Sequence, residues 1–189
     1  MIKRTISLAL AMGLIAVSGC NSNDQSASAK QGTEAVKKAG DKTIAAGLDQ
    51  KGRFLTLAKA AGLDATLAGP GPYTVFVPDD AAFEKLPAGT VDGWTKPEAR
   101  TELTRTLSYH ILPGTVLAAD INKAIDDGKG KAVLATMGGG TLTATREGDK
   151  IILTDSDGHK AAMAASDETL ANGVVHRVDA VLIPGKAAA

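Results

Sequence analysis

Apolar residues follow a helical period in the first half of the sequence. Four of them stand at positions i, i+3, i+4 and i+7 of one predicted helix face: Phe54, Leu57, Ala58 and Ala61. Gly62 and Leu63 predict the end of this helix, because glycine accepts the left-handed backbone of a helix cap and leucine packs back on the last turn. Asp64 then predicts the cap of a short second helix.

Prolines and capping residues divide the next stretch. Tyr73–Val77 lies between prolines and predicts a strand, and Asp79 or Asp80 predicts the cap of a short helix after it. Thr95 and Glu98 fit a capping box, which predicts a longer helix. We expect Pro113-Gly114 to end that helix, and its buried face would hold Ala99, Leu103, Thr106, Leu107 and His110.

Beyond Thr115 the period shortens towards two, which is typical of strands. Five short runs predict strands: Lys131–Thr136, Thr141–Arg146, Lys150–Thr154, His159–Ala165 and Val174–Ile183. Turn dipeptides separate the later runs at Asp157-Gly158 and Asn172-Gly173, and Gly138–Gly140 predicts a hairpin or bulge. Helices first and strands later indicate an α+β fold with an antiparallel sheet system and no βαβ repeats.

The N-terminus has the pattern of an export signal. Lys3 and Arg4 precede an uncharged apolar run, Ile6–Val17, which is shorter than the ~20 residues that span a bilayer. Val17-Ser18-Gly19-Cys20 resembles the bacterial lipobox, in which the thiol accepts a diacylglyceryl group. We therefore predict a signal peptide over residues 1–19 and lipidation at Cys20; the alternative is an ordinary secretory signal that contains a cysteine.

Residues 20–43 lack the apolar residues needed to bury a face. We predict a lipid-anchored flexible tether there, with a short helix over Thr33–Ala39 as the alternative. A globular domain is expected over residues 44–185 and a short tail over 186–189. This organisation would hold one domain near a membrane through its lipid anchor without fixing its orientation.

Composition excludes several function classes. Of the 189 residues, 21 are Lys or Arg and 21 are Asp or Glu, so a basic stripe for nucleic acid is not expected. The single cysteine excludes an intrachain disulfide framework and a multi-cysteine zinc site. We predict no cofactor and no metal, since the three histidines follow no metal-binding spacing.

The candidate catalytic residues have simpler structural explanations. His110 and His176 fall on predicted apolar faces, so we expect buried, hydrogen-bonded histidines, and His159 is expected in a solvated turn. A hydrolase would pair Ser108 with His110, but residues two apart face opposite sides of a helix. Asp79 and Asp80 could act as acid and base, although helix capping explains them as well.

Three stretches, in this order, resemble the fasciclin domain. They are Gly71–Phe83, then Leu107–Gly114 with its Tyr-His pair, and then Asn172–Pro184. The resemblance implies a fasciclin-like β-sandwich or wedge of about seven strands with N-terminal and inserted α-helices. Arg177 departs from the family pattern, in which an aliphatic residue is common there; the strand alternation predicts that it points outward.

The resemblance also implies a non-catalytic role in adhesion or interaction. Animal members of the family are reported to meet receptors at the Tyr-His region and before the third stretch, so possible partner-binding residues are Tyr109, His110, Asp167 and Glu168. The alternative is a purely structural role for these residues. Tyr109 lies about 100° around the predicted helix from His110, so we expect it to leave the core face.

The sequence therefore predicts an envelope lipoprotein that contacts an unknown protein, matrix or cell-surface partner, without catalysis. The first alternative is an envelope protein that binds a small molecule or lipid, which needs an apolar pocket of about 300 Å³ or more. The second is a hydrolase with a nucleophile and a base in hydrogen-bond reach.

Overall fold

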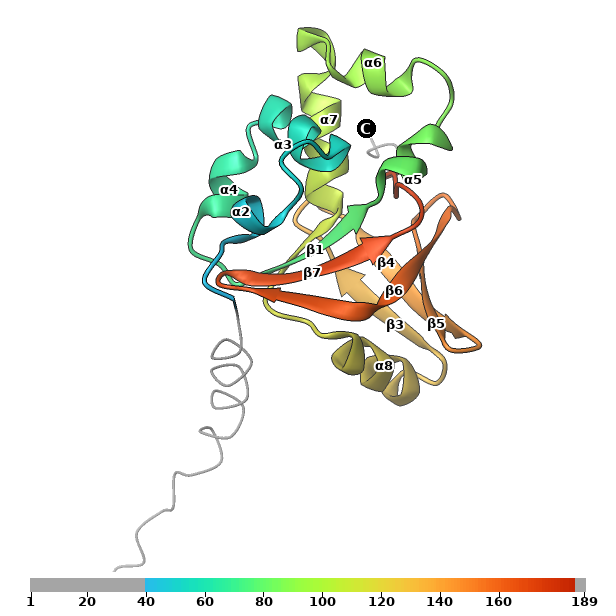
Figure 1. The fold of residues 1–189 in the computed structure, drawn as a ribbon. Helices are drawn as coiled ribbons and strands as arrows, with labels where there is room; N and C mark the ends of the chain where they lie inside the picture. Colours follow the sequence, from blue (N-terminus) through green and yellow to red (C-terminus); the bar gives the residue numbers. More distant parts are fainter. Residues whose placement is uncertain (1–39, 186–189) are drawn as a thin grey trace, which may run out of the picture.

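A computed structural model describes residues 40–185, without the side chains of residues 165 and 166. Within these residues seven strands form one sheet in the order β2-β1-β7-β6-β5-β4-β3 (Figure 1). Their bounds are β1 Tyr73–Pro78, β2 Ile111–Pro113, β3 Lys131–Ala135, β4 Thr141–Glu147, β5 Lys150–Thr154, β6 Lys160–Leu170 and β7 Gly173–Val178. All neighbouring strands are antiparallel except β1 and β7, which run parallel. The prediction of an entirely antiparallel sheet is wrong at this pair, whose strands lie at opposite ends of the domain sequence.

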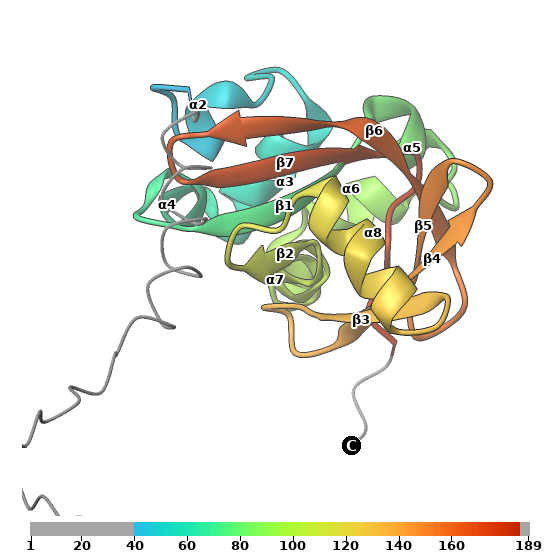
Figure 2. The same cartoon turned by 90° about the horizontal axis from the view of Figure 1, so that it is seen from below.

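The helices cover two sides of this sheet. Their bounds are α2 Ile44–Gly47, α3 Arg53–Ala61, α4 Asp64–Ala68, α5 Asp80–Glu84, α6 Thr90–Trp94, the 3₁₀ turn η1 Pro97–Ala99, α7 Arg100–Tyr109 and α8 Ala118–Asp127. The helices from α2 to α7 gather on one side of β1 and β7, and α8 lies on the opposite side (Figures 1 and 2). The fold is therefore the predicted α+β wedge with N-terminal and inserted helices.

An irregularity within β6 lets this strand join the two halves of the wedge. The first half of β6 pairs with β5 and its second half pairs with β7, with a register shift between Met163 and Asp167. At the other edge, the Met137 N–H donates to the Ile111 carbonyl at 2.8 Å and ties the β3–β4 hairpin to β2. These two features bring the sheet edges near one another.

Two hydrophobic clusters share strand β1. Val75 and Val77 join the cluster under the helices, whereas Phe76 points into the cluster between the sheet and α8. This alternation follows from the two-residue period of a strand. Both faces of β1 are buried, which explains why its sequence is mostly apolar. The buried Thr74 hydroxyl is hydrogen-bonded, since it donates to the Gly114 carbonyl at 2.8 Å.

Two predicted helix boundaries are confirmed. Gly62 takes the left-handed backbone, with φ of 78°, and the Leu63 N–H donates to the Ala58 carbonyl at 2.8 Å. The Asp79 carboxylate accepts from the Ala82 N–H at 2.7 Å and caps α5. Asp64 is not a cap: it is the first residue of α4, whose N-cap is Leu63.

The capping box predicted at Thr95 is wrong. Its hydroxyl donates backwards to the Asp92 carbonyl at 2.8 Å, and α7 begins only at Arg100, after the 3₁₀ turn. The helix also ends earlier than predicted, at Tyr109. The residues Ile111–Pro113 instead pair with β1. Their backbone N–H and C=O groups form hydrogen bonds in the sheet, so they are not available to extend the helix.

The period-two interpretation beyond Thr115 missed α8. Of its residues only Ile121 and Ile125 are buried hydrophobics, so the helical stripe is too sparse to stand out from the polar positions. The predicted strand over Val174–Ile183 stops at Val178, after which the chain continues without regular structure. The predicted glycine hairpin is confirmed between β3 and β4.

The N-terminal predictions lie outside the described residues, including the signal peptide, Cys20 and the tether up to residue 39. From Gly40 onward the chain is hydrogen-bonded to the end of β6 and to the turn after it. The Gly40 N–H donates to Thr169, and the Lys42 carbonyl accepts from the Ala171 N–H at 2.8 Å. No helix in the described part of the chain has both the length and the apolar character needed to cross a membrane.

Candidate functional site

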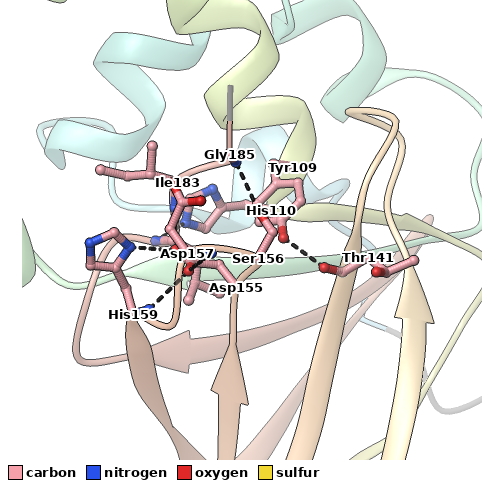
Figure 3. Close-up of polar contacts among 10 residues, drawn as sticks. Tyr109, His110, Thr141, Asp155, Ser156, Asp157, His159, Ile183 and Gly185 are labelled. Carbon is pink, nitrogen blue, oxygen red and sulfur yellow. Dashed lines mark hydrogen bonds and ion pairs between the residues drawn. The ribbon is translucent and has the colours of Figure 1, made fainter. Parts of the chain in front are cut away.

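The Tyr109 side chain is enclosed by the protein. It is 1% exposed and packs in the cluster between the sheet and α8, and its Oη donates to the Thr141 carbonyl at 2.6 Å (Figure 3). Burial raises the pKa of this phenol above its ordinary value. The expectation that Tyr109 leaves the core face is wrong, because α7 ends at this residue and a second core lies beside it.

The glycine hairpin between β3 and β4 lies directly on Tyr109. A Cβ at Gly138 would stand 2.7 Å from the Tyr109 backbone nitrogen, and a Cβ at Gly140 would stand 2.7 Å from its ring carbon Cε2. The Gly138 N–H also donates to the Ser108 carbonyl at 2.9 Å. These two glycines therefore permit a close approach that no side chain could share.

His110 uses both ring nitrogens inside the protein. Its side chain is fully buried; Nδ1 contacts the Thr106 carbonyl at 2.9 Å, and Nε2 accepts from the Leu182 N–H at 3.1 Å. These partners place the proton on Nδ1. Burial lowers the pKa of His110 to about 4. The prediction of a buried, hydrogen-bonded histidine is confirmed, and no ring nitrogen remains to serve as a base for Ser108.

Asp155 organises the chain around the end of β5, a role that sequence reasoning missed. Its Oδ1 accepts from the N–H groups of Asp157 and His159 at 3.0 and 2.9 Å, and its Oδ2 accepts from the Ile183 N–H at 3.1 Å (Figure 3). The His159 Nδ1 lies 2.9 Å from the same Oδ2, although the His159 side chain is 56% exposed. The Asp-x-x-Gly turn carried the signal for the local bonds, but nothing in the sequence pointed to Ile183.

The segment that follows β7 is held by side chains from two parts of the chain, the end of α7 and the turn after β5. His110 binds it at Leu182 and Asp155 binds it at Ile183, while the Ser156 hydroxyl accepts from the Gly185 N–H at 2.9 Å (Figure 3). The Arg105 guanidinium donates to the Gly185 carbonyl. The cluster around the Tyr-His pair thus closes the domain by anchoring its last described segment.

His176 lies beside Asp167, one of the two candidate partner-binding residues on β6. Its buried ring stacks on Phe76 with centroids 5.5 Å apart, and its Nε2–H donates to the Val116 carbonyl at 2.8 Å. Burial lowers the pKa of His176. Its Nδ1 lies 3.2 Å from Asp167 Oδ1 without the geometry of a hydrogen bond, while Asp167 accepts from the Ala118 N–H at 3.1 Å. A neutral His176 therefore has an unprotonated, unpartnered Nδ1 beside a carboxylate.

Replacing Asp167 with asparagine is expected to raise the free energy of unfolding by about 1 kcal/mol at pH 7, because the amide can donate to His176 Nδ1 and still accept from Ala118. Urea denaturation would measure the change. Asp179→Asn is the matched control, since Asp179 accepts from the Ala162 N–H at 2.7 Å but faces no histidine. A loss of stability in Asp167→Asn would instead show that a protonated His176 pairs with Asp167.

Of the four possible partner-binding residues, two are accessible. Tyr109 and His110 are buried and cannot touch a partner in this conformation. The Asp167 side chain is 25% exposed, and that of Glu168 is 42% exposed with its Oε2 3.6 Å from Arg177 Nη2. Of the two segments predicted to bind partners, the one on β6 is thus the one with exposed side chains.

Two clefts of the described domain contain charged side chains in their linings. One of about 440 Å³ lies between α7 and the β3–β4 hairpin and is lined by Arg100, Thr101, Thr104, Arg105, Ser108, Met137 and Gly138. Another of about 220 Å³ combines the apolar side chains of Leu48, Phe54 and Val77 with Asp49, Asp79, Asp80 and Arg177. Both linings place charged side chains beside apolar surface. Within residues 40–185, no three His, Cys, Asp or Glu residues are grouped to hold a metal ion.

Comparison with known families gives one domain match. A sequence-family model described as the Fasciclin domain matches residues 50–184. The chain is 33% identical over 141 residues to Protein sll1483 of Synechocystis sp., an alignment that covers 75% of this chain and 71% of that protein. It is 34% identical over 119 residues to the cell surface glycolipoprotein MPB83 of Mycobacterium bovis, covering 63% of this chain and 46% of that protein.

A solved structure has the same fold. It is described as a novel fold in a FAS1 domain pair from the insect cell adhesion molecule Fasciclin I. The match has a TM-score of 0.64 at 17% sequence identity and covers 77% of this chain and 52% of that chain. The chain spans about half of that two-domain structure.

Proposed function

Because the chain belongs to the fasciclin domain family, we propose that it is a non-catalytic envelope lipoprotein whose single domain makes contact with a protein, matrix polymer or another cell. The observation that carries this proposal is the use of the Tyr-His pair. Both His110 ring nitrogens and the Tyr109 hydroxyl are bonded to backbone groups, so the most chemically versatile residues of the family resemblance maintain the fold. The domain is then left to act through its surface.

The proposed attachment is a lipid on Cys20 followed by a tether that ends where the chain joins the domain, at Gly40. The lipobox-like Val17-Ser18-Gly19-Cys20 supports it, as does the likeness to a relative named a cell surface glycolipoprotein. Two or three acyl chains would hold the protein at a membrane, where one chain binds only marginally. One domain on one tether has no avidity of its own, so firm adhesion would depend on many copies.

Cys20→Ser is expected to abolish lipid attachment and to release the protein from the membrane fraction, because it removes the only thiol in the chain. Mass spectrometry of the wild-type membrane fraction should find an N-terminus at residue 20 that carries acyl mass. An unmodified wild-type chain cleaved elsewhere would contradict the proposed anchor.

The contact surface is proposed to include Asp167 and Glu168 on β6. Glu168→Ala is expected to weaken binding of the full-length lipoprotein to intact cells or matrix by roughly tenfold, while the melting temperature stays unchanged. Quantified pull-down from cross-linked envelopes, together with thermal unfolding, would measure both effects.

The matched control for this test is Glu84→Ala. Each substitution removes an exposed carboxylate that faces one arginine, at 3.6 Å for Glu168 with Arg177 and 3.4 Å for Glu84 with Arg53. Equal binding by the two variants would place the contact surface elsewhere. Failure of the wild-type protein to retain any envelope or matrix partner would contradict the proposed function itself.

A further inference from the structure

One face of α7 forms the wall of a cleft that the fold does not fill. Five of its residues recur with the helical repeat and line this wall: Arg100, Thr101, Thr104, Arg105 and Ser108. The opposite wall is the β3–β4 hairpin at Met137 and Gly138, and the cleft between them has a volume of about 440 Å³. The hairpin is held in place, because the Gly138 N–H donates to the Ser108 carbonyl and Gly138 packs directly against the Tyr109 backbone.

The lining of this cleft is positive, although the charges of the whole chain balance. It contains two arginines and no Asp, Glu or Lys. Neither Arg100 nor Arg105 forms an ion pair with any residue between 40 and 185. Arg105 donates to the Gly185 carbonyl, which fixes its guanidinium while leaving other N–H donors of that group for a ligand.

The remaining groups of the lining suit a protein ligand. Met137 is 46% exposed, and a flexible thioether adapts to varied apolar side chains. Thr104 is committed to the Ala61 carbonyl at 3.1 Å, whereas Thr101 is exposed on the same face. Arginine and methionine are enriched at protein interfaces, where lysine and acidic residues are depleted, and this lining has that composition.

We propose that the cleft between α7 and the β3–β4 hairpin binds an extended, acidic segment of a partner protein, an inference that rests on the proposed contact function. Arg100 and Arg105 are separated by about 7.5 Å along the helix axis. They are also about 140° apart around the axis, with the Arg100 guanidinium beside Gly62 and that of Arg105 at the Gly185 carbonyl. An extended chain with carboxylates at alternate positions presents them about every 6.6–6.8 Å along one side, so it offers acidic partners along the length of this lining. An apolar side chain of the segment then packs on Met137.

The test is a fluorescence-anisotropy titration of the purified full-length protein with a short labelled peptide in which glutamate alternates with valine. The same peptide with glutamine in place of glutamate is the ligand control. The glutamate peptide should bind, more weakly as salt increases, and the glutamine peptide should not. Arg100→Gln should reduce the affinity roughly tenfold, because it removes a charge-assisted hydrogen bond, and Met137→Ala should reduce it to a smaller extent.

Arg146→Gln is the matched control variant and should bind as the wild type does. Arg146 is an exposed arginine of β4 that pairs with Asp126 of α8 at 3.1 Å, and it does not line the cleft. Equal affinities of Arg100→Gln and Arg146→Gln would overturn the proposal. So would an Arg100-dependent complex with a uronate oligosaccharide in the absence of peptide binding, which would make the occupant a glycan.

The same variants separate this inference from the proposed function. Full envelope binding by Arg100→Gln, with no peptide binding by the wild type, would remove the cleft proposal and leave the contact role intact. Peptide binding that depends on Arg100, in a protein that retains no envelope or matrix partner, would support the cleft as a peptide site and contradict the proposed contact function.

Discussion

Tyr109→Ala is expected to lower the free energy of unfolding by about 3–5 kcal/mol, the range for removing a buried aromatic ring. The ring is 1% exposed and lies under Gly138 and Gly140, so the loss leaves a cavity that the bonded hairpin cannot readily close. It also leaves the Thr141 carbonyl without its donor. Because most domains have only 5–15 kcal/mol of stability, this variant should be largely unfolded at elevated temperature.

Two further variants separate the causes of this loss. Tyr109→Phe keeps the ring and removes only the hydrogen bond to Thr141, for which about 1 kcal/mol is expected. Tyr73→Ala removes the protein's other tyrosine, which is only partly buried, and should cost less than Tyr109→Ala. Urea denaturation measures all three. A melting curve unchanged by Tyr109→Ala would refute the burial of this ring and restore it as a candidate contact residue.

Acidification is expected to destabilise the protein between about pH 6.5 and pH 4, with His110 contributing about 3 kcal/mol. Burial lowers the folded-state pKa to about 4, so within this window the unfolded chain binds a proton that native His110 does not. Stability therefore rises with pH, is complete above about 6.5, and is lost as the pH falls towards 4. His176 acts in the same direction, because burial lowers its pKa as well.

Urea denaturation at a series of pH values would measure this slope. His110→Gln removes the titrating group and should flatten the dependence, whatever its effect on stability at pH 7. His159→Gln is the control, since the His159 side chain is 56% exposed and should leave the slope nearly unchanged. A His110→Gln protein with the wild-type slope would show that other groups control the acid response.

The two most destabilising changes expected here lie in the segment that the family resemblance suggested for binding. Tyr109 and His110 contact the hairpin, β4 and the segment after β7, all distant in the sequence. Surface residues of the domain are consequently the better places to look for partner contacts. Asp167 with Glu168 on β6 and Arg100 on α7 provide separate tests of that view.

Elements whose signals are local could be predicted from the amino-acid sequence alone. Gly62 ends α3 and Asp79 caps α5 because the required backbone conformation and hydrogen bond involve residues within one turn. The buried face of α3 was recognisable from its period, and the burial of His110 and His176 followed from apolar neighbours. The order of the three resemblance stretches was enough to predict the fold class.

Features that depend on partners far along the chain could not be predicted in this way. The parallel pairing of β1 with β7 joins Tyr73 to Gly173, and no local period encodes such a neighbour. The α7 helix stops at Tyr109 because the next residues pair with β1, which overrides a helical pattern that continues to His110. Tyr109 is buried because a second core, completed by α8 and the glycine hairpin, covers the side of α7 that a single-core interpretation leaves in solvent.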